Sequence, residues 1–205
     1  MSTRRIVLIK TTLTAMFLAL GLTLPFLTGQ IPQIGSMLLP MHIPVFLCAL
    51  ICGWEYALPM AAVLPLFRSL LFGMPPLYPA AVSMAFELAA YAFVAGFLFA
   101  RLKFKLLPKT CISLIAAMLI GRAVWGAAQA SLLGFSGKSF TFQAFLAGAF
   151  LNAFPGIILQ LILIPAVMLA LAGAKMIPVG HKNVGITDKT PANEWAETEN
   201  NNDQQ

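Results

Sequence analysis

Long apolar segments separated by short loops constrain this chain more than any other feature. Six of them cover residues 6–27, 41–53, 56–72, 79–102, 106–133 and 142–174, with proline and glycine clusters between them. A membrane-spanning helix needs about 20 consecutive, mainly apolar residues, and a tilted or sheltered helix departs from that length. The sequence therefore predicts an all-α membrane protein with six transmembrane helices.

The distribution of charge divides the chain into two parts. Hydrophobic residues make up 60% of the 205 residues and charged residues only 10%, whereas soluble domains are about a quarter charged. The basic excess behind the net charge of +6 lies in residues 1–177, which hold eleven Lys or Arg and only two acids, Glu55 and Glu87; residues 178–205 hold two lysines and the other five acids. We expect a six-helix transmembrane domain over 1–177, a disordered polar tail over 178–205, and no nucleic-acid partner.

Basic residues fix the expected orientation, because short cytoplasmic loops retain Lys and Arg. They form three groups, at the start of the first segment, after the fourth and after the sixth: Arg4, Arg5 and Lys10; Arg101, Lys103, Lys105 and Lys109; Lys175 and Lys182. An even number of crossings separates these groups, so both termini are predicted to be cytoplasmic. The outward loop over 28–40 has no charge, and we expect it to fold over the protein as a lid.

Polar side chains inside the apolar segments gather at similar depth. They are Arg68, Glu87 and Arg122, supported by His42, Gln129, Asn152 and Gln160. At 1.5 Å per residue, the three ionisable residues together with Gln129 and Asn152 lie roughly 6–16 Å from the outer helix ends, and His42 opens the second segment. Three stripes at helical spacing run through this zone: Ser83–Glu87–Tyr91, Arg122–Trp125–Gln129 and Asn152–Gly156–Gln160. Ionisable groups at such positions usually face a bundle interior or a cavity, which predicts a ligand pocket in the outer half of the membrane.

Several of these residues fit two interpretations. Glu87 could pair with Arg68 or Arg122 only to join helices, but this leaves one arginine over, and a bound carboxylate would neutralise it. Tyr78, Tyr91 and Trp125 suit either an interfacial belt or pocket walls. His42, at the start of its segment, is more readily explained as a local hydrogen-bond partner than as a ligand contact.

The first segment and the cysteines add two expectations. Thr11, Ala15, Ala19 and Thr23 are each four apart and form a small-residue strip, a spacing that lets another helix approach closely in lipid. Cys48, Cys52 and Cys111 are expected to act as small apolar residues, with no metal site and no cofactor. No nucleophile–base pair is visible, so an enzyme is not expected.

These features together resemble the substrate-binding membrane subunits, or S components, of bacterial energy-coupling factor (ECF) vitamin transporters. The resemblance covers about residues 5–175 and rests on the motif Ala15-Met-Phe-Leu-Ala19 and on two longer segments, 39–54 and 65–76, which look like the pantothenate-type branch. It implies that Ala15 and Ala19 meet a transmembrane coupling subunit. It also implies that the pocket is built from outer loops and the last three helices.

The resemblance further implies a transport function and a cellular location. The chain would capture a vitamin outside the bacterial cytoplasmic membrane and deliver it by toppling when docked on the coupling subunit and two ATPase subunits. No G-x-x-x-x-G-K-[ST] loop is present, so ATP would be bound by those separate subunits. Pantothenate, with one carboxylate plus hydroxyl and amide groups, suits the predicted side chains. Another vitamin or precursor, and a stand-alone secondary carrier of a small organic anion, remain alternatives.

Overall fold

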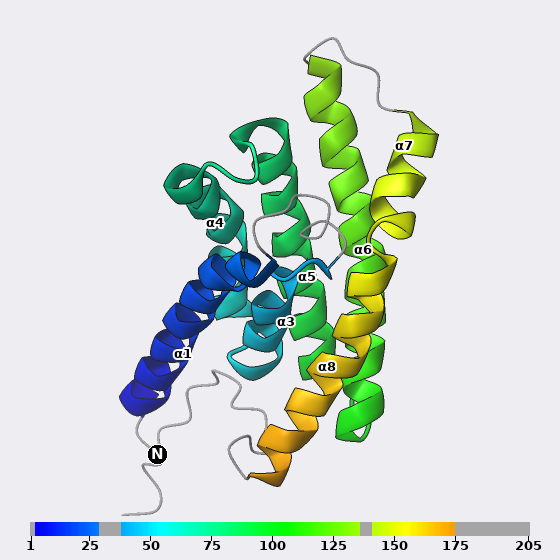
Figure 1. The fold of residues 1–205 in the computed structure, drawn as a ribbon. Coiled ribbons are helices and arrows are strands. Elements are labelled where there is room, and N and C mark those ends of the chain that lie inside the picture. The colour runs from blue at the N-terminus through cyan, green and yellow to red at the C-terminus, as the bar shows by residue number, and fades with distance from the viewer. Residues whose placement is uncertain (1–2, 29–37, 136–140, 175–205) are drawn as a thin grey trace, which may run out of the picture.

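The computed structural model describes residues 3–28, 38–135 and 141–174, and within these ranges it contains helices and no strand (Figure 1). The elements in chain order are α1 Thr3–Thr23, η1 Leu24–Thr28, α3 His42–Ile51, α4 Trp54–Phe72, η2 Leu77–Ala81, α5 Val82–Arg101, α6 Leu106–Phe135, α7 Phe142–Leu146, η3 Ala147–Leu151 and α8 Phe154–Gly173. The predicted all-α class is thus confirmed for these residues. The lid segment and the polar tail fall largely or wholly outside them.

Among the described residues, five helical stretches are long and apolar enough to cross a membrane: Arg4–Phe26, Trp54–Phe72, Leu77–Arg101, Leu106–Gly134 and Phe154–Gly173. The remaining predicted span is α3, whose ten residues give a length of only about 15 Å. That is half of the ~30 Å hydrocarbon core of a bilayer. Each of the six predicted segments is therefore helical, but the second is too short to cross alone.

Gly53 separates the second and third segments, which were predicted to be two helices. Helix α3 ends at Ile51, and α4 begins at Trp54 after Gly53, whose φ of 99° is open to glycine but strained for other residues. The two-helix prediction is confirmed. Pro59 does not interrupt the helix, since it lies inside α4.

The sixth segment, expected to be one helix, is divided into α7, the turn η3 and α8. Asn152 and Ala153 lie at the break, and Pro155 occupies the first turn of α8. Proline is well suited to a first helical turn, because its missing N–H has no partner there in any case. The proline therefore begins a new helix and does not merely loosen a continuous one.

Helix α5 lies at the centre of the bundle, packed against α3, α4 and α6, while α1 lies at its edge against α3 and α4 (Figure 1). The core is made of large side chains from several helices, including Phe46, Leu64, Leu88, Tyr91 and Leu114. The start of α1, the α5–α6 connection and the end of α8 all lie at the lower end of the bundle in Figure 1. Two of the three basic groups, those of α1 and of the α5–α6 connection, thus share one end.

Candidate functional site

A buried ion pair between two helices lies at the centre of the candidate site. Glu87 is on α5 and Arg122 is on α6, and Arg122 Nη1 lies 2.9 Å from Glu87 Oε1. Both side chains are almost fully buried, at 2% and 5% exposure. In such surroundings an unpaired charge would be strongly destabilising, so each residue stabilises the charge of the other.

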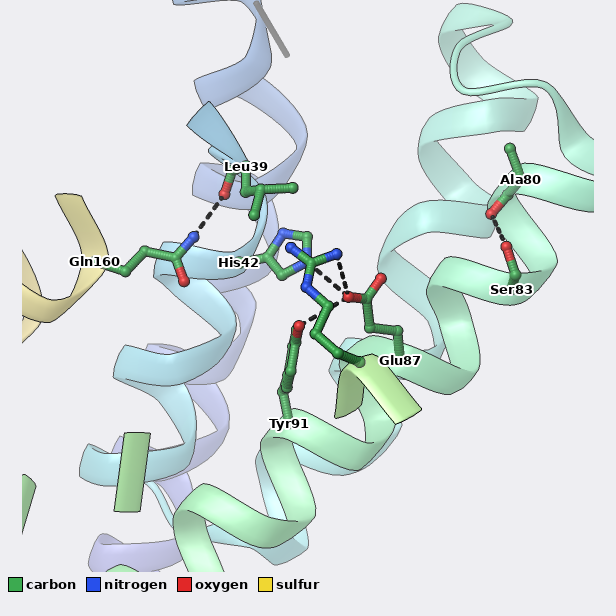
Figure 2. A network of polar contacts seen from close by, with 8 residues as sticks. Leu39, His42, Ala80, Ser83, Glu87, Tyr91 and Gln160 are labelled. Carbon is green, nitrogen blue, oxygen red and sulfur yellow. Dashed lines mark hydrogen bonds and ion pairs between the residues drawn. The ribbon is translucent and has the colours of Figure 1, made fainter. Parts of the chain in front are cut away.

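Two aromatic side chains complete the surroundings of the carboxylate (Figure 2). The Tyr91 hydroxyl, one helical turn from Glu87, donates a hydrogen bond of 2.8 Å to the same Oε1. His42, at the first residue of α3, places Nε2 3.8 Å from that oxygen and its ring 5.3 Å from the ring of Tyr91. Residues that are far apart in the sequence, from α3, α5 and α6, therefore meet at one carboxylate oxygen.

The site has more hydrogen-bonding capacity than its described residues use. Arg122 Nε and Nη2 and both ring nitrogens of His42 are buried and have no hydrogen-bond partner within the described ranges. The great majority of buried polar atoms in folded proteins are hydrogen-bonded, so each exception needs an explanation. Two guanidinium nitrogens of Arg122 and the His42 imidazole thus lie beside the ion pair with unused hydrogen-bonding capacity among the described residues, and donors of this kind can bind a small anion.

The start of α3 is held in place from α8. Gln160, which is buried, donates a hydrogen bond of 3.4 Å from Nε2 to the Leu39 carbonyl, and the His42 N–H donates to the same oxygen at 3.0 Å (Figure 2). Leu39 has a φ of 50°, a left-handed conformation that is strained for a residue with a side chain. Such local strain is found mainly at functional sites. No pattern in the sequence pointed to a special role for Leu39.

Asn152 does not share the buried face of Gln160. It is exposed, whereas Gly156 and Gln160 on α8 are buried. The expected stripe assumed a continuous helix, but the break at Asn152 and Ala153 rotates Asn152 out of line. The structure therefore does not bring Asn152 to the Glu87 cluster.

Arg68 lies in a different place from Arg122. Its Nη1 donates a hydrogen bond of 2.6 Å to the Leu22 carbonyl of α1, and its guanidinium stacks on the rings of Phe26 and Phe72, at 5.1 and 5.5 Å. A backbone carbonyl and two aromatic faces thus stabilise this buried cation. Arg68 fastens the end of α1 to α4.

The other predicted site residues lie nearer the ends of α6. Tyr78 is exposed and its hydroxyl donates to the Leu132 carbonyl, which joins the α4–α5 connection to α6. Trp125 is half-buried and stacks on Phe145 of α7 at 6.4 Å. Gln129 is also half-buried, and its buried Oε1 has no hydrogen-bond partner in the described part of the chain.

The small-residue strip of α1 faces outward. Thr11, Ala15, Ala19 and Thr23 are all exposed. Over residues 4–26 only Gly21 and Pro25 are buried. This face is therefore accessible to another helix.

The cysteines and possible metal ligands form no further site. Cys48 and Cys52 are buried free thiols, and Cys111 is partly exposed. The described residues contain no group of three or more His, Cys, Asp or Glu side chains that could hold a metal ion.

Comparison with known proteins gives the chain its family. Residues 9–168, most of the chain, match the family described as "ECF transporter, substrate-specific component". No curated protein and no solved structure was found to match. Members of this family are components of transporters and not enzymes, and they bind a substrate and dock on an ECF module. With five apolar helices long enough to cross a membrane and a match over most of its length, the chain belongs to the substrate-specific components of ECF transporters.

Proposed function

We propose that this S component binds a small vitamin that bears a carboxylate, with pantothenate as the first candidate. The observation that supports this most directly is the unused pair of donors on Arg122, Nε and Nη2, in a buried site. A guanidinium can bind a carboxylate through two parallel N–H···O bonds. Because Glu87 uses only Nη1, the same arginine can bind the protein's own carboxylate and that of a ligand.

Neutral polar groups around the arginine suit the rest of such a molecule. Pantothenate also carries hydroxyl and amide groups, which need both donors and acceptors when buried. The His42 ring nitrogens and Gln129 Oε1 lack partners in the described residues, and these atoms supply both kinds of group. Trp125, on the same helix as Arg122 and Gln129, supplies an aromatic wall.

The same proposal includes the transport cycle. The chain captures its vitamin on the outer side of the bacterial cytoplasmic membrane, docks through Ala15 and Ala19 of α1, and topples while separate ATPase subunits supply energy. The absence of charge from residues 28–40 lowers the free energy of bringing that segment into the bilayer. A protein cross-linked so that it cannot rotate, yet still transporting, would contradict the toppling step.

Ligand-dependent thermal unfolding of the detergent-purified chain tests the substrate. A ligand at a hundred times its dissociation constant stabilises the folded state by about 2.7 kcal/mol. Stabilisation by pantothenate alone, lost in Arg122→Gln, supports the proposal. Stabilisation by another member of a vitamin panel keeps the S-component role and replaces the substrate.

Uptake into proteoliposomes separates an S component from a secondary carrier. The proposal predicts that vitamin uptake needs the coupling subunit, both ATPases and ATP. Uptake driven by an ion gradient, with this chain alone in the bilayer, would identify it as a carrier.

A further inference from the structure

Few ionisable groups lie around His42. Glu87 and Tyr91 face it from α5, and Arg122 faces it from α6. The remaining elements packed against α3 add no further charge beside the ring. Lys10 of α1 lies over the ring of Tyr56, Arg68 of α4 is bound to the end of α1, and α8 has no ionisable residue. Residues 29–37, which connect α1 to the start of α3, also have none.

The net charge of the site follows from this set. Arg122 contributes +1 and Glu87 contributes −1, so the ion pair without ligand carries no net charge. A ligand carboxylate on the free side of Arg122 would add one uncompensated negative charge in a buried place, which is strongly unfavourable.

His42 is placed to compensate that charge. It is 1% exposed, and Nε2 lies 3.8 Å from Glu87 Oε1, which is near enough for attraction between charges but too long for a hydrogen bond. Both nitrogens lack partners among the described residues. A protonated imidazole donates from both nitrogens, so it could serve Glu87 through one and a ligand through the other.

We propose that binding of an anionic ligand beside Arg122 is coupled to the uptake of one proton by His42. This rests on the proposed function, because it assigns a regulation to the same site. The ligand arrives as a carboxylate, the proton comes from the solvent, and no covalent bond changes. The complex then contains two positive charges, on Arg122 and His42, and two negative charges, on Glu87 and the ligand.

The sign of the pH dependence follows from proton linkage. If the bound state holds one more proton than the free state, the dissociation constant rises by about tenfold for each pH unit above neutrality. The ligand carboxyl stays ionised throughout this range, since such groups titrate near pH 4. The change therefore belongs to the protein.

Isothermal titration calorimetry of the purified full chain with sodium pantothenate tests the coupling. Titrations at pH 7.5 in buffers of different ionisation enthalpy give the number of protons taken up from the slope of the observed heat. The expected slope is close to one proton per ligand. Pantothenol, in which an alcohol replaces the carboxylate, should bind more weakly and with a slope near zero.

Variants assign the proton to a residue. His42→Gln should bind pantothenate with a slope near zero, and Tyr91→Phe, which changes the same cluster without removing the imidazole, should keep the wild-type slope. Retention of the slope in His42→Gln would place the proton elsewhere and overturn the inference. Should His42→Gln fail to fold, two measurements on the wild-type chain still decide whether carboxylate binding takes up a proton. They are the comparison of pantothenate with pantothenol and the pH series of the dissociation constant.

The two proposals fail in different ways. Pantothenate binding with a slope of zero in the wild-type chain would overturn proton coupling and leave the vitamin-binding function intact. An absence of pantothenate binding would overturn the coupling to this ligand together with the proposed substrate.

Discussion

The Arg122 guanidinium meets the Glu87 carboxylate through one nitrogen only: Nη1 lies 2.9 Å from Oε1, while Nε and Nη2 have no hydrogen-bond partner in the described residues. A purely structural ion pair is most stable when the fork of the arginine is fully used. Here the pair keeps the arginine charged and oriented while leaving donors free. The pair thus combines a structural role with a capacity for binding.

Glu87→Gln should destabilise the protein without ligand by about 3–5 kcal/mol, because it leaves the Arg122 charge unpaired in a buried place. An anionic ligand then replaces the missing carboxylate, so pantothenate should raise the unfolding temperature more than in the wild type. Thermal unfolding with and without pantothenate measures both effects. Glu55→Gln, at an exposed residue, is the control and should change neither. Equal ligand stabilisation in Glu87→Gln and the wild type would contradict this account.

Arg122→Lys and Arg68→Lys should separate binding from stability. Lysine keeps the charge but lacks the planar fork, so Arg122→Lys should weaken pantothenate binding by roughly tenfold to a hundredfold, which corresponds to one charged hydrogen bond. Arg68→Lys loses its ring stacking and should lower the unfolding temperature while the dissociation constant stays the same. Titration calorimetry and thermal unfolding of both variants provide the measurements. If Arg68→Lys lost pantothenate binding and Arg122→Lys kept it, ligand recognition would be assigned to Arg68.

The choice between these arginines shows where prediction from the sequence ends. Both were placed inside apolar segments and both could reach Glu87 by depth alone. The choice depends on how α4 and α6 rotate about their axes, and on the rings of Phe26 and Phe72, which stabilise Arg68 from two sides. No spacing within one helix contains that information. Tyr91, four residues from Glu87 on one helix, was predictable for the opposite reason, since its contact is local.

Gly121→Ala should destabilise the protein by about 1–3 kcal/mol, as overpacking of a core does. A Cβ at Gly121 would lie 2.2 Å from the ring of Tyr91, so the ring must move and its hydrogen bond to Glu87 is disturbed. Gly134→Ala near the end of the same helix is the matched control, because its Cβ would meet nothing within 4 Å. Unfolding temperatures of the two variants give the comparison. Equal values would show that the ring relaxes freely.

Ala15→Leu should weaken assembly with the coupling subunit and leave vitamin binding unchanged, since a larger side chain on the strip keeps the partner helix at a distance. Co-purification with the coupling subunit and ATPases measures assembly, and calorimetry measures vitamin binding. Ala123→Leu makes the same change at an exposed position of α6 and should not affect assembly. Normal assembly of Ala15→Leu would place the docking surface elsewhere.

The sequence was sufficient to predict those parts of the fold that depend on hydrophobicity and on local backbone conformation. The apolar segments and Gly53 gave the helices and the break between α3 and α4. The division of the last segment was not predicted, because its hydrophobicity runs on through α7, η3 and α8. Pro155 marked the place, but a proline can either kink a helix or begin one, and only tertiary packing selects between them.

The exposed outward face of α1 has a consequence for how subunits of this kind find each other. Over residues 4–26 only Gly21 and Pro25 are buried, so in a bilayer the outward face of α1 is covered by acyl chains until a partner arrives. Assembly through the proposed docking surface on Ala15 and Ala19 would then exchange lipid for protein, and the release of water would contribute little to it. The strength of such docking would depend on bilayer thickness and acyl-chain order, so a subunit affinity measured in one lipid mixture would not transfer to another.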